Sequence, residues 1–114
     1  MKVIDTNNKK AFKPDNHFGN LTVVDVLGPE NSDHLTIQVS FGPVGSGSDM
    51  HSHEKSEQLF FILSGRLTMI GGDGEKEILS SGMAAYLSPK ESHATLNEGE
   101  EGVVALVITS PHLR

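Results

Sequence analysis

Two histidines, His51 and His53, are separated by one residue, and a third, His93, lies forty residues further along the chain. On a β-strand, residues i and i+2 point to the same face about 6.6 Å apart, because each residue rises by ~3.3 Å. Two imidazoles at that spacing can bind one metal ion through bonds of about 2.1 Å. Two histidines with this spacing and no other partner are more often simply solvated surface residues. A metal site therefore needs a further ligand. Glu57 and Gln58 are the nearest candidates, and His93 is the distant one.

The residues around this pair resemble the first sequence motif of the cupin family. That motif reads glycine, five residues, His-x-His, three or four residues, glutamate, six residues, glycine. Gly45, His51 and His53 match it in register, and Gly65 supplies the closing glycine.

The position of the acidic ligand departs from the family pattern. Counting back six residues from Gly65 reaches Gln58, so a glutamine stands where most of the family has glutamate. Glu57 fits the shorter gap after the histidines, but seven residues then separate it from Gly65. The amide oxygen of glutamine can bind a metal through a lone pair. A glutamine ligand occurs in some small cupins, including ones that act on polyketides or unsaturated uronates.

A second segment is similar to the second cupin motif, which reads glycine, five residues, Pro-x-Gly, two residues, histidine, three residues, asparagine. Gly82, His93 and Asn97 match in register. Ser88 replaces the proline, with a proline directly after it, and Lys90 replaces the second glycine. The two motifs together cover residues 45–97.

The resemblance implies an all-β antiparallel double-stranded β-helix, the cupin jelly roll, with one divalent transition metal inside it. The ligands that carry over are His51, His53 and His93, with Gln58 as the fourth. In the alternative, three histidines hold the metal with waters, and Gln58 only donates and accepts hydrogen bonds. Zn, Mn, Fe and Ni all remain open, because sites built from N and O ligands select metals largely by availability.

An all-neutral ligand set leaves the full charge of the ion at the site. We therefore expect a Lewis acid that acts on a small carbonyl or carboxylate substrate, in an isomerase, cyclase or lyase type of reaction. The alternatives are a cupin dioxygenase and a non-catalytic barrel that binds a sugar-like small molecule. No catalytic residue is identified, and the sequence leaves open whether the chain is an enzyme.

Composition narrows the class of protein. The 114 residues suit one domain, and the absence of cysteine excludes disulfides and thiolate metal sites. The net charge of −6 disfavours nucleic acid and anionic membranes as partners. No apolar run is long enough to span a membrane, and the N-terminus lacks the apolar core of a signal peptide. We expect a cytoplasmic protein that binds a small molecule.

The remaining sequence predicts strands and turns, without a helix of three turns. Residues 1–20 read as an N-terminal arm or edge strand, and residues 21–114 as the barrel domain, in which residues 45–48 form a flexible loop before the histidine pair. The expected strands, nine or ten in all, include residues 21–27, 33–41, 58–63, 66–70, 75–79, 83–87, 92–97 and 103–109. Residues 58–63 are apolar on both faces, which predicts a strand covered on both sides. This strand and the arm favour a homodimer.

Other residues could contribute to the site or to the fold. Asn97 is expected to cap a turn, and Arg66 to be solvated or to anchor an anionic substrate. His17, His34 and His112 lie outside the motifs and receive no role. The residues that could line a pocket, with packing in the core as the alternative, are Phe60, Ile62, Met69, Met83 and Tyr86.

Overall fold

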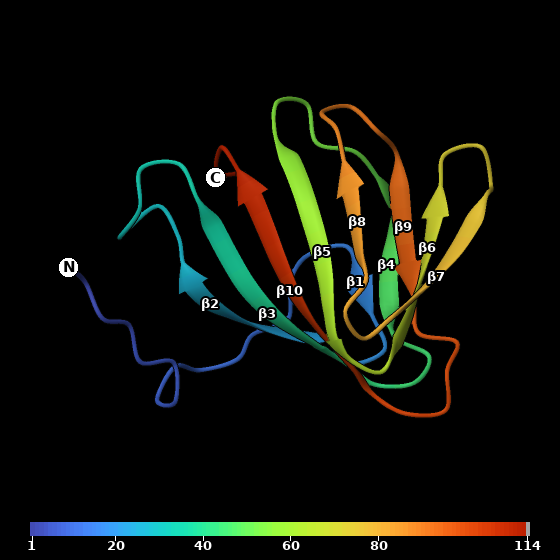
Figure 1. Ribbon diagram of the computed structural model, residues 1–114, viewed down its shortest axis with the longest axis horizontal. Coiled ribbons are helices and arrows are strands. Elements are labelled where there is room, and N and C mark those ends of the chain that lie inside the picture. The colour runs from blue at the N-terminus through green and yellow to red at the C-terminus, as the bar shows by residue number, and fades with distance from the viewer. Residues whose placement is uncertain (114) are drawn as a thin grey trace.

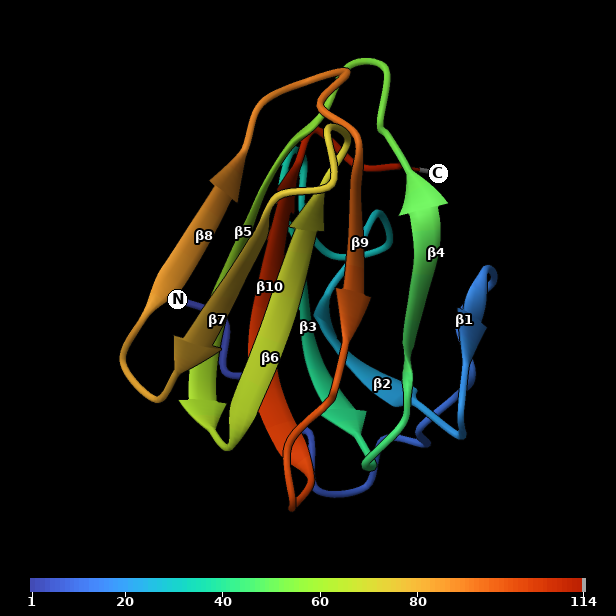
Figure 2. The ribbon, with the colours of Figure 1, turned by 90° about the vertical axis from the view of Figure 1, so that its right-hand side faces the viewer.

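Residues 1–113 are described by a computed structural model, in which two five-stranded antiparallel sheets face each other (Figures 1 and 2). Arg114, with which the expected barrel domain ends, lies outside the described residues. The strands are β1 (His17–Phe18), β2 (Thr22–Leu27), β3 (Thr36–Gly42), β4 (Gly47–His51), β5 (Glu57–Ser64), β6 (Arg66–Gly71), β7 (Lys76–Ser80), β8 (Ala84–Leu87), β9 (His93–Leu96) and β10 (Val103–Ser110). No helix capable of spanning a membrane occurs within residues 1–113.

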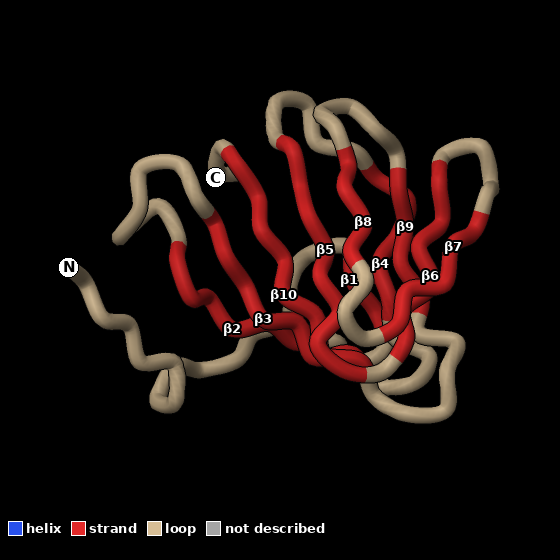
Figure 3. The backbone as a smooth tube through the Cα atoms, in the orientation of Figure 1, coloured by secondary structure: helices blue, strands red, loops and turns tan. Residues whose placement is uncertain are grey.

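The chain passes repeatedly from one sheet to the other. The first sheet has the order β1-β4-β9-β6-β7, and the second has the order β2-β3-β10-β5-β8. Strands distant in sequence therefore pair, as β4 does with β9 and β3 with β10. Figure 3 shows the result: within the described residues, strands are joined by loops and there is no helix. The expected all-β jelly roll of nine or ten strands is confirmed.

The sequence predicts a flexible loop at residues 45–48, but half of this segment forms part of a strand. Gly47 and Ser48 belong to β4, and Ser46 and Ser48 are buried, Ser46 with only 1% of its surface exposed. The Ser48 and Thr95 hydroxyl groups are 2.9 Å apart across β4 and β9. A side chain at Gly47 would collide with the Thr95 carbonyl oxygen. The serines and glycines are small because β9 approaches closely, and composition alone cannot distinguish this from flexibility.

The N-terminal arm is partly built into the fold. Phe12 forms an isolated antiparallel bridge with Val23, and β1 pairs with β4 at the edge of the first sheet. The arm thus supplies an edge strand, one of the two possibilities read from the sequence. The boundary between arm and barrel domain at residue 20 stays a prediction.

The hydrophobic core fills one side of the space between the sheets. It is centred on Ile62 of β5, which has no exposed surface, and is formed by Ile62, Leu67, Met69, Leu79, Leu87, Val103 and Ala105. These residues come mainly from β5 to β8 and from β10. The other side, beneath β2, β3 and β4, remains open as a cavity.

The motif glycine Gly65 joins β5 to β6 in a left-handed conformation, with φ of 80°. A Cβ atom there would collide with the Gly102 carbonyl oxygen, so both the turn and the close approach of the next segment require glycine.

The motif asparagine Asn97 closes the turn after β9. Its side-chain Nδ2 donates to the carbonyl oxygens of Gly42 and Glu101, at 3.0 and 2.9 Å, and its Oδ1 accepts from the Gly99 amide at 3.0 Å. Only 1% of its surface is exposed. The structural role expected for Asn97 is confirmed.

We predict that Asn97→Ala lowers the free energy of unfolding by about 2–3 kcal/mol, because it leaves two carbonyl groups and an amide without their partner. Urea denaturation followed by circular dichroism measures the change. Glu100→Ala, an exposed neighbour in the same turn, is the control and should stay within about 0.5 kcal/mol of the wild type. A loss below about 1 kcal/mol for Asn97→Ala would contradict the role of this turn.

Candidate metal centre

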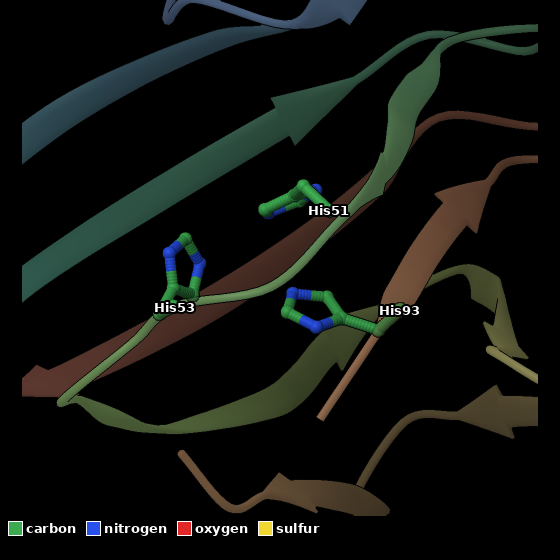
Figure 4. Close-up of side chains that lie close together, drawn as sticks. All are labelled: His51, His53 and His93. Carbon is green, nitrogen blue, oxygen red and sulfur yellow. The ribbon is translucent and has the colours of Figure 1, made fainter. Parts of the chain in front are cut away.

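Three histidines converge between the sheets (Figure 4). His51 ends β4 and His93 begins β9, where the two residues pair in register. His53 lies two residues after β4, and one ring nitrogen of each histidine lies within 4.8 Å of the others. Nitrogens that bind one ion at about 2.1 Å are at most about 4.2 Å apart, so small side-chain rotations suffice to complete a site. The three histidines are positioned to hold a metal ion.

The histidines do not converge through the i, i+2 strand geometry that their spacing predicts. His53 is not in a strand, because β4 ends at His51. A β-bulge lies between Ser48 and His51, so the regular alternation is already broken before the histidines. The pair converges through the bulge and the loop rather than through an i, i+2 repeat.

Backbone carbonyl groups set the tautomer of two of the rings. His51 Nδ1 lies 2.6 Å from the Asp49 carbonyl oxygen, and His93 Nδ1 lies 3.0 Å from that of Glu91. A carbonyl oxygen only accepts, so Nδ1 carries the proton and donates in both rings. Nε2 therefore presents its lone pair, which is the arrangement that a metal-binding histidine requires.

Three buried polar atoms in the site have no hydrogen-bond partner: His53 Nε2, His93 Nε2 and Gln58 Oε1. Buried polar atoms are rarely left unpaired, because each costs about 1–3 kcal/mol. An ion bound to these lone pairs would remove that cost. The donor set of imidazole nitrogens and an amide oxygen therefore fits a divalent transition metal.

The amide of Gln58 is anchored from the neighbouring strand. Gln58 on β5 faces Thr109 on β10 in register, and its Nε2 donates to the Thr109 hydroxyl oxygen at 3.0 Å. With Nε2 occupied in this way, Oε1 is the atom left for another partner. Thr109 was not recognised from the sequence, because only the pairing of β5 with β10 brings it to Gln58.

Glu57, the other candidate for the fourth ligand, points away from the histidines. It is exposed and accepts a hydrogen bond from the Tyr86 hydroxyl at 3.0 Å. Neighbouring residues of a strand face opposite sides, so Gln58 can line the cavity only if Glu57 does not.

Burial favours the neutral form of His53 and His93. It lowers the pKa of His53 and of His93, and the neighbouring His51 lowers both further. The Gln58 side chain partly offsets this for His53, and the carbonyl oxygen of Glu91 does so for His93. At pH 7 the unprotonated rings predominate, so their lone pairs are available to a metal.

The loop before β9 holds the His53 segment in place. The Lys90 amide donates to the His53 carbonyl oxygen at 2.7 Å. Lys90 has φ of 71°, in the left-handed region that favours glycine. The family motif has glycine at this position, so the substitution by lysine keeps the backbone conformation that the motif prescribes.

A cavity of about 600 Å³ opens beside the histidines, between the first sheet and β2, β3 and β10. Hydroxyl and amide groups line it at Ser40, Ser46, Ser48, Thr95, Thr36 and Gln38, and apolar side chains line it at Val23, Phe60 and Val107. Residues 12–17 of the N-terminal arm form part of its wall. This volume suits a small organic molecule with several polar groups.

Of the residues considered for the pocket wall, only Phe60 lines the cavity. Ile62 and Met69 pack in the core instead. Met83 is exposed, and Tyr86 has 58% of its surface exposed on the outside of the second sheet, so neither lines the pocket or packs in the core. Arg66 is exposed beside a separate shallow depression formed with Gly99, Glu100 and Glu101.

The structure brings one further histidine to the cavity. His17 on β1 pairs with Ser48 of β4 and lines the wall beside it. Its Nδ1 lies 2.7 Å from the Asp15 carbonyl oxygen, the same arrangement as in His51 and His93. The sequence predicts no role for His17, because a two-residue edge strand leaves no periodic signal.

We predict that His51→Ala and His93→Ala each weaken Zn²⁺ binding by about 100-fold or more. Mutation of a residue that only hydrogen-bonds to a metal ligand already lowers metal affinity by about 10–100-fold, and loss of the ligand itself should lower it further. Isothermal titration and elemental analysis of the purified protein measure this. His34→Ala, at an exposed histidine outside the cluster, should bind Zn²⁺ like the wild type. Equal affinity in all three variants would show that the cluster is not the metal site.

Sequence comparison identifies the family of the chain. The family model for the cupin domain matches residues 38–109. An uncharacterized protein of Methanocaldococcus jannaschii is 36% identical over 69 residues, which make up 60% of this chain and 54% of that protein. The chain thus spans about half the length of the curated relative it matches.

Solved structures share the whole architecture at low sequence identity. A predicted oxalate decarboxylase of Thermotoga maritima superposes with a TM-score of 0.85 at 19% identity, covering 96% of this chain and 99% of that one. The polyketide cyclase RemF of Streptomyces resistomycificus gives 0.82 at 18%, covering 96% and 79%. KdgF of Halomonas sp. gives 0.83 at 17%, covering 98% and 94%. The family match, the two facing sheets and the histidine cluster agree, and the chain belongs to the cupin family.

Proposed function

We propose that this cupin is a metalloenzyme whose single divalent transition metal is held by His51, His53, His93 and Gln58. Its substrate is a small carbonyl or carboxylate compound, and its reaction is an isomerisation, a cyclisation or a lyase-type cleavage. The observation that carries the proposal is the buried, unpaired Gln58 Oε1, held by Thr109 in the cavity that His51 and His53 also line.

The chain contributes donors without charge. Three neutral imidazoles and one amide offset none of the positive charge of a divalent ion, whereas a carboxylate at position 58 would offset part of it. Such an ion, held by these residues, would polarise a carbonyl group and lower the pKa of bound water. The neutral shell therefore favours Lewis-acid chemistry over the dioxygenase alternative.

The cavity can hold and orient a substrate of this class. Its hydroxyl groups offer hydrogen bonds to substrate oxygens, and Phe60 and Val107 exclude water from the apolar part. His17 stands in the same wall with Nδ1 held by a backbone carbonyl, which leaves Nε2 to accept or return a proton. We assign His17 the proton transfer that isomerase, cyclase and lyase reactions need.

Proteins of the same fold support this choice of reaction class. They include a polyketide cyclase and a predicted oxalate decarboxylase, so the architecture is found with chemistry on carbonyl and carboxylate compounds.

We predict that Gln58→Leu weakens Zn²⁺ binding by at least about 10-fold, because it removes the amide oxygen and keeps a similar volume. Titration calorimetry measures the affinity. Glu57→Gln is the matched control on the opposite face of β5 and should leave the affinity unchanged within about 2-fold. Unchanged affinity in Gln58→Leu would reduce the ligand set to three histidines.

Proton exchange next to a carbonyl group tests the reaction class. The metal-loaded protein is incubated anaerobically in D₂O with a panel of 2-oxo acids, β-diketones and keto sugars, and loss of the α-proton signal is followed by NMR. We expect exchange on at least one compound, abolished by His51→Ala and slowed about 100-fold in His17→Gln, whose metal content stays normal.

Other outcomes separate the alternatives. Oxygen consumption that depends on bound iron, without anaerobic exchange, would establish the dioxygenase. Saturable binding of a sugar without turnover of any compound would establish a binding barrel.

A further inference from the structure

We propose that Thr36 and His112 form a proton relay in the wall of the cavity, and that the substrate carries a hydroxyl group on the carbon β to its carbonyl group. The reaction is then cleavage of the bond between that carbon and the α-carbon. This inference rests on the metalloenzyme function proposed above, and it narrows the substrate to β-hydroxy carbonyl compounds and the reaction to the lyase type.

The Thr36 hydroxyl group and the His112 ring form a short hydrogen bond, with Oγ1 and Nδ1 2.6 Å apart. His112 Nε2 lies 2.8 Å from the Ser32 carbonyl oxygen. A carbonyl oxygen only accepts, so Nε2 carries the proton in the neutral ring, and Nδ1 accepts the proton of the Thr36 hydroxyl group. A hydroxyl group bonded to a base that a third group orients is the arrangement that activates hydroxyl groups in catalysis.

His112 has the opposite tautomer from His17, His51 and His93. In those three rings a backbone carbonyl oxygen holds Nδ1, and Nε2 presents the lone pair. In His112 a carbonyl oxygen holds Nε2 instead, and the lone pair of Nδ1 is directed to a hydroxyl group. The basic nitrogen of His112 therefore serves Thr36.

Thr36 connects this pair to the site. It begins β3, lines the cavity and has 6% of its surface exposed. It also belongs to a row across the second sheet, because Gln58 pairs with Thr109 and Thr109 pairs with Thr36. Strands are about 4.8 Å apart, so the backbone of Thr36 lies about 10 Å from that of Gln58, the proposed metal ligand. A substrate with its carbonyl group at the metal centre and its chain along this row brings a later group to Thr36.

Contacts on both sides fix the segment that carries His112. Ser56, which is buried, donates from its Oγ to the Pro111 carbonyl oxygen at 2.6 Å. Ser32 lies in the loop between β2 and β3, and the C-terminal segment turns toward this loop (Figure 1). His112 is half-buried, so it can exchange protons with water between reaction cycles. The sequence predicts no role for His112, because only this turn of the chain brings it to Thr36.

The direction of the hydrogen bond selects the reaction. Because the Thr36 proton is donated to His112, the Thr36 oxygen has lone pairs to offer to the cavity, and it accepts a proton from the substrate hydroxyl group. Loss of that hydroxyl group as water requires a proton donor beside it. Cleavage of the adjacent carbon–carbon bond requires a base, which the relay supplies.

Protons and electrons balance in the cleavage. The substrate hydroxyl proton passes to Thr36 Oγ1 as the Thr36 proton passes to His112 Nδ1. The hydroxyl oxygen forms a carbonyl group, and the bond from its carbon to the α-carbon breaks. The electron pair of that bond goes to the α-carbon, which takes a proton from protonated His17 on the first sheet. His112 gains one proton and His17 gives one up, so two carbonyl products form without an oxidant or a further reactant.

Two reactions of the Zn²⁺-loaded protein, compared as a ratio, test the relay. Cleavage is measured on 4-hydroxy-2-oxopentanoate and 4-hydroxy-2-oxoglutarate, which both yield pyruvate, detected with lactate dehydrogenase. The reference is deuterium exchange at C3 of 2-oxopentanoate, which has no hydroxyl group for the relay to deprotonate. A purely structural defect lowers both reactions and leaves their ratio unchanged.

We expect Thr36→Val and His112→Phe each to lower the ratio of cleavage to exchange by about 100-fold. Thr36→Ser keeps a hydroxyl group and should restore most of the ratio. The control is His34→Phe, at an exposed histidine in the same loop as Ser32, and it should keep the ratio of the wild type.

Two kinds of failure are distinguishable. Exchange without cleavage in the wild type, or an unchanged ratio in Thr36→Val, would overturn the relay and leave the metalloenzyme function standing. Absence of both exchange and cleavage would overturn the function on which the relay rests.

A second measurement needs no turnover. ¹⁵N NMR of the histidine side chains distinguishes a protonated ring nitrogen from one with a lone pair, at about pH 8, where histidine is mostly neutral. We expect the His112 proton on Nε2, and a changed Nδ1 signal in Thr36→Val. A proton on Nδ1 of His112 would overturn the relay whatever the activity. Circular dichroism and bound Zn²⁺ report that each variant is folded.

Discussion

The pairing of β4 with β9 is the constraint on which the site depends. It sets His51 opposite His93, two residues that are far apart in the sequence, and the bulge before His51 turns the chain so that His53 joins them. The small residues of β4 allow β9 to approach, and the Lys90 amide fixes the loop that carries His53. The histidines are thus placed by backbone contacts before any metal contributes. Preorganisation of this kind reduces the entropy that metal binding must overcome.

The second sheet supplies what the first sheet lacks. β5 and β10 bring Gln58 and Thr109 together opposite the histidines, and both side chains are buried. A cavity between two sheets can combine donors from each, whereas a single strand offers only its own alternate residues. The inner side of β3 is polar and gives the cavity hydroxyl and amide groups. The hydrophobic core therefore fills only part of the space between the sheets.

Much of this could be read from the sequence, for identifiable reasons. Alternation and turn residues revealed eight strands, and motif spacing selected Gln58, which lines the cavity while Glu57 does not. Contacts between distant segments were not readable. The composition around Gly47 is typical of a flexible loop, although the segment is a strand. Thr109 and His17 reach the cavity only through strand pairing. The exposure of Tyr86 depends on which side of β8 faces solvent. Alternation along a strand shows that its two faces differ in polarity, but it does not show which face lies inside the protein.

Adjacent residues of β10 face opposite sides of the sheet, since Thr109 holds Gln58 inside and Ile108 points outwards. A one-residue slip of β10 against β5 would exchange the two sides, setting Ile108 against the amide of Gln58 and Thr109 into the outer surface. The bulge between Val104 and Ala105 already shifts the register with β5 at the other end. Natural length variation in this strand is therefore expected near Val104 and excluded near Thr109.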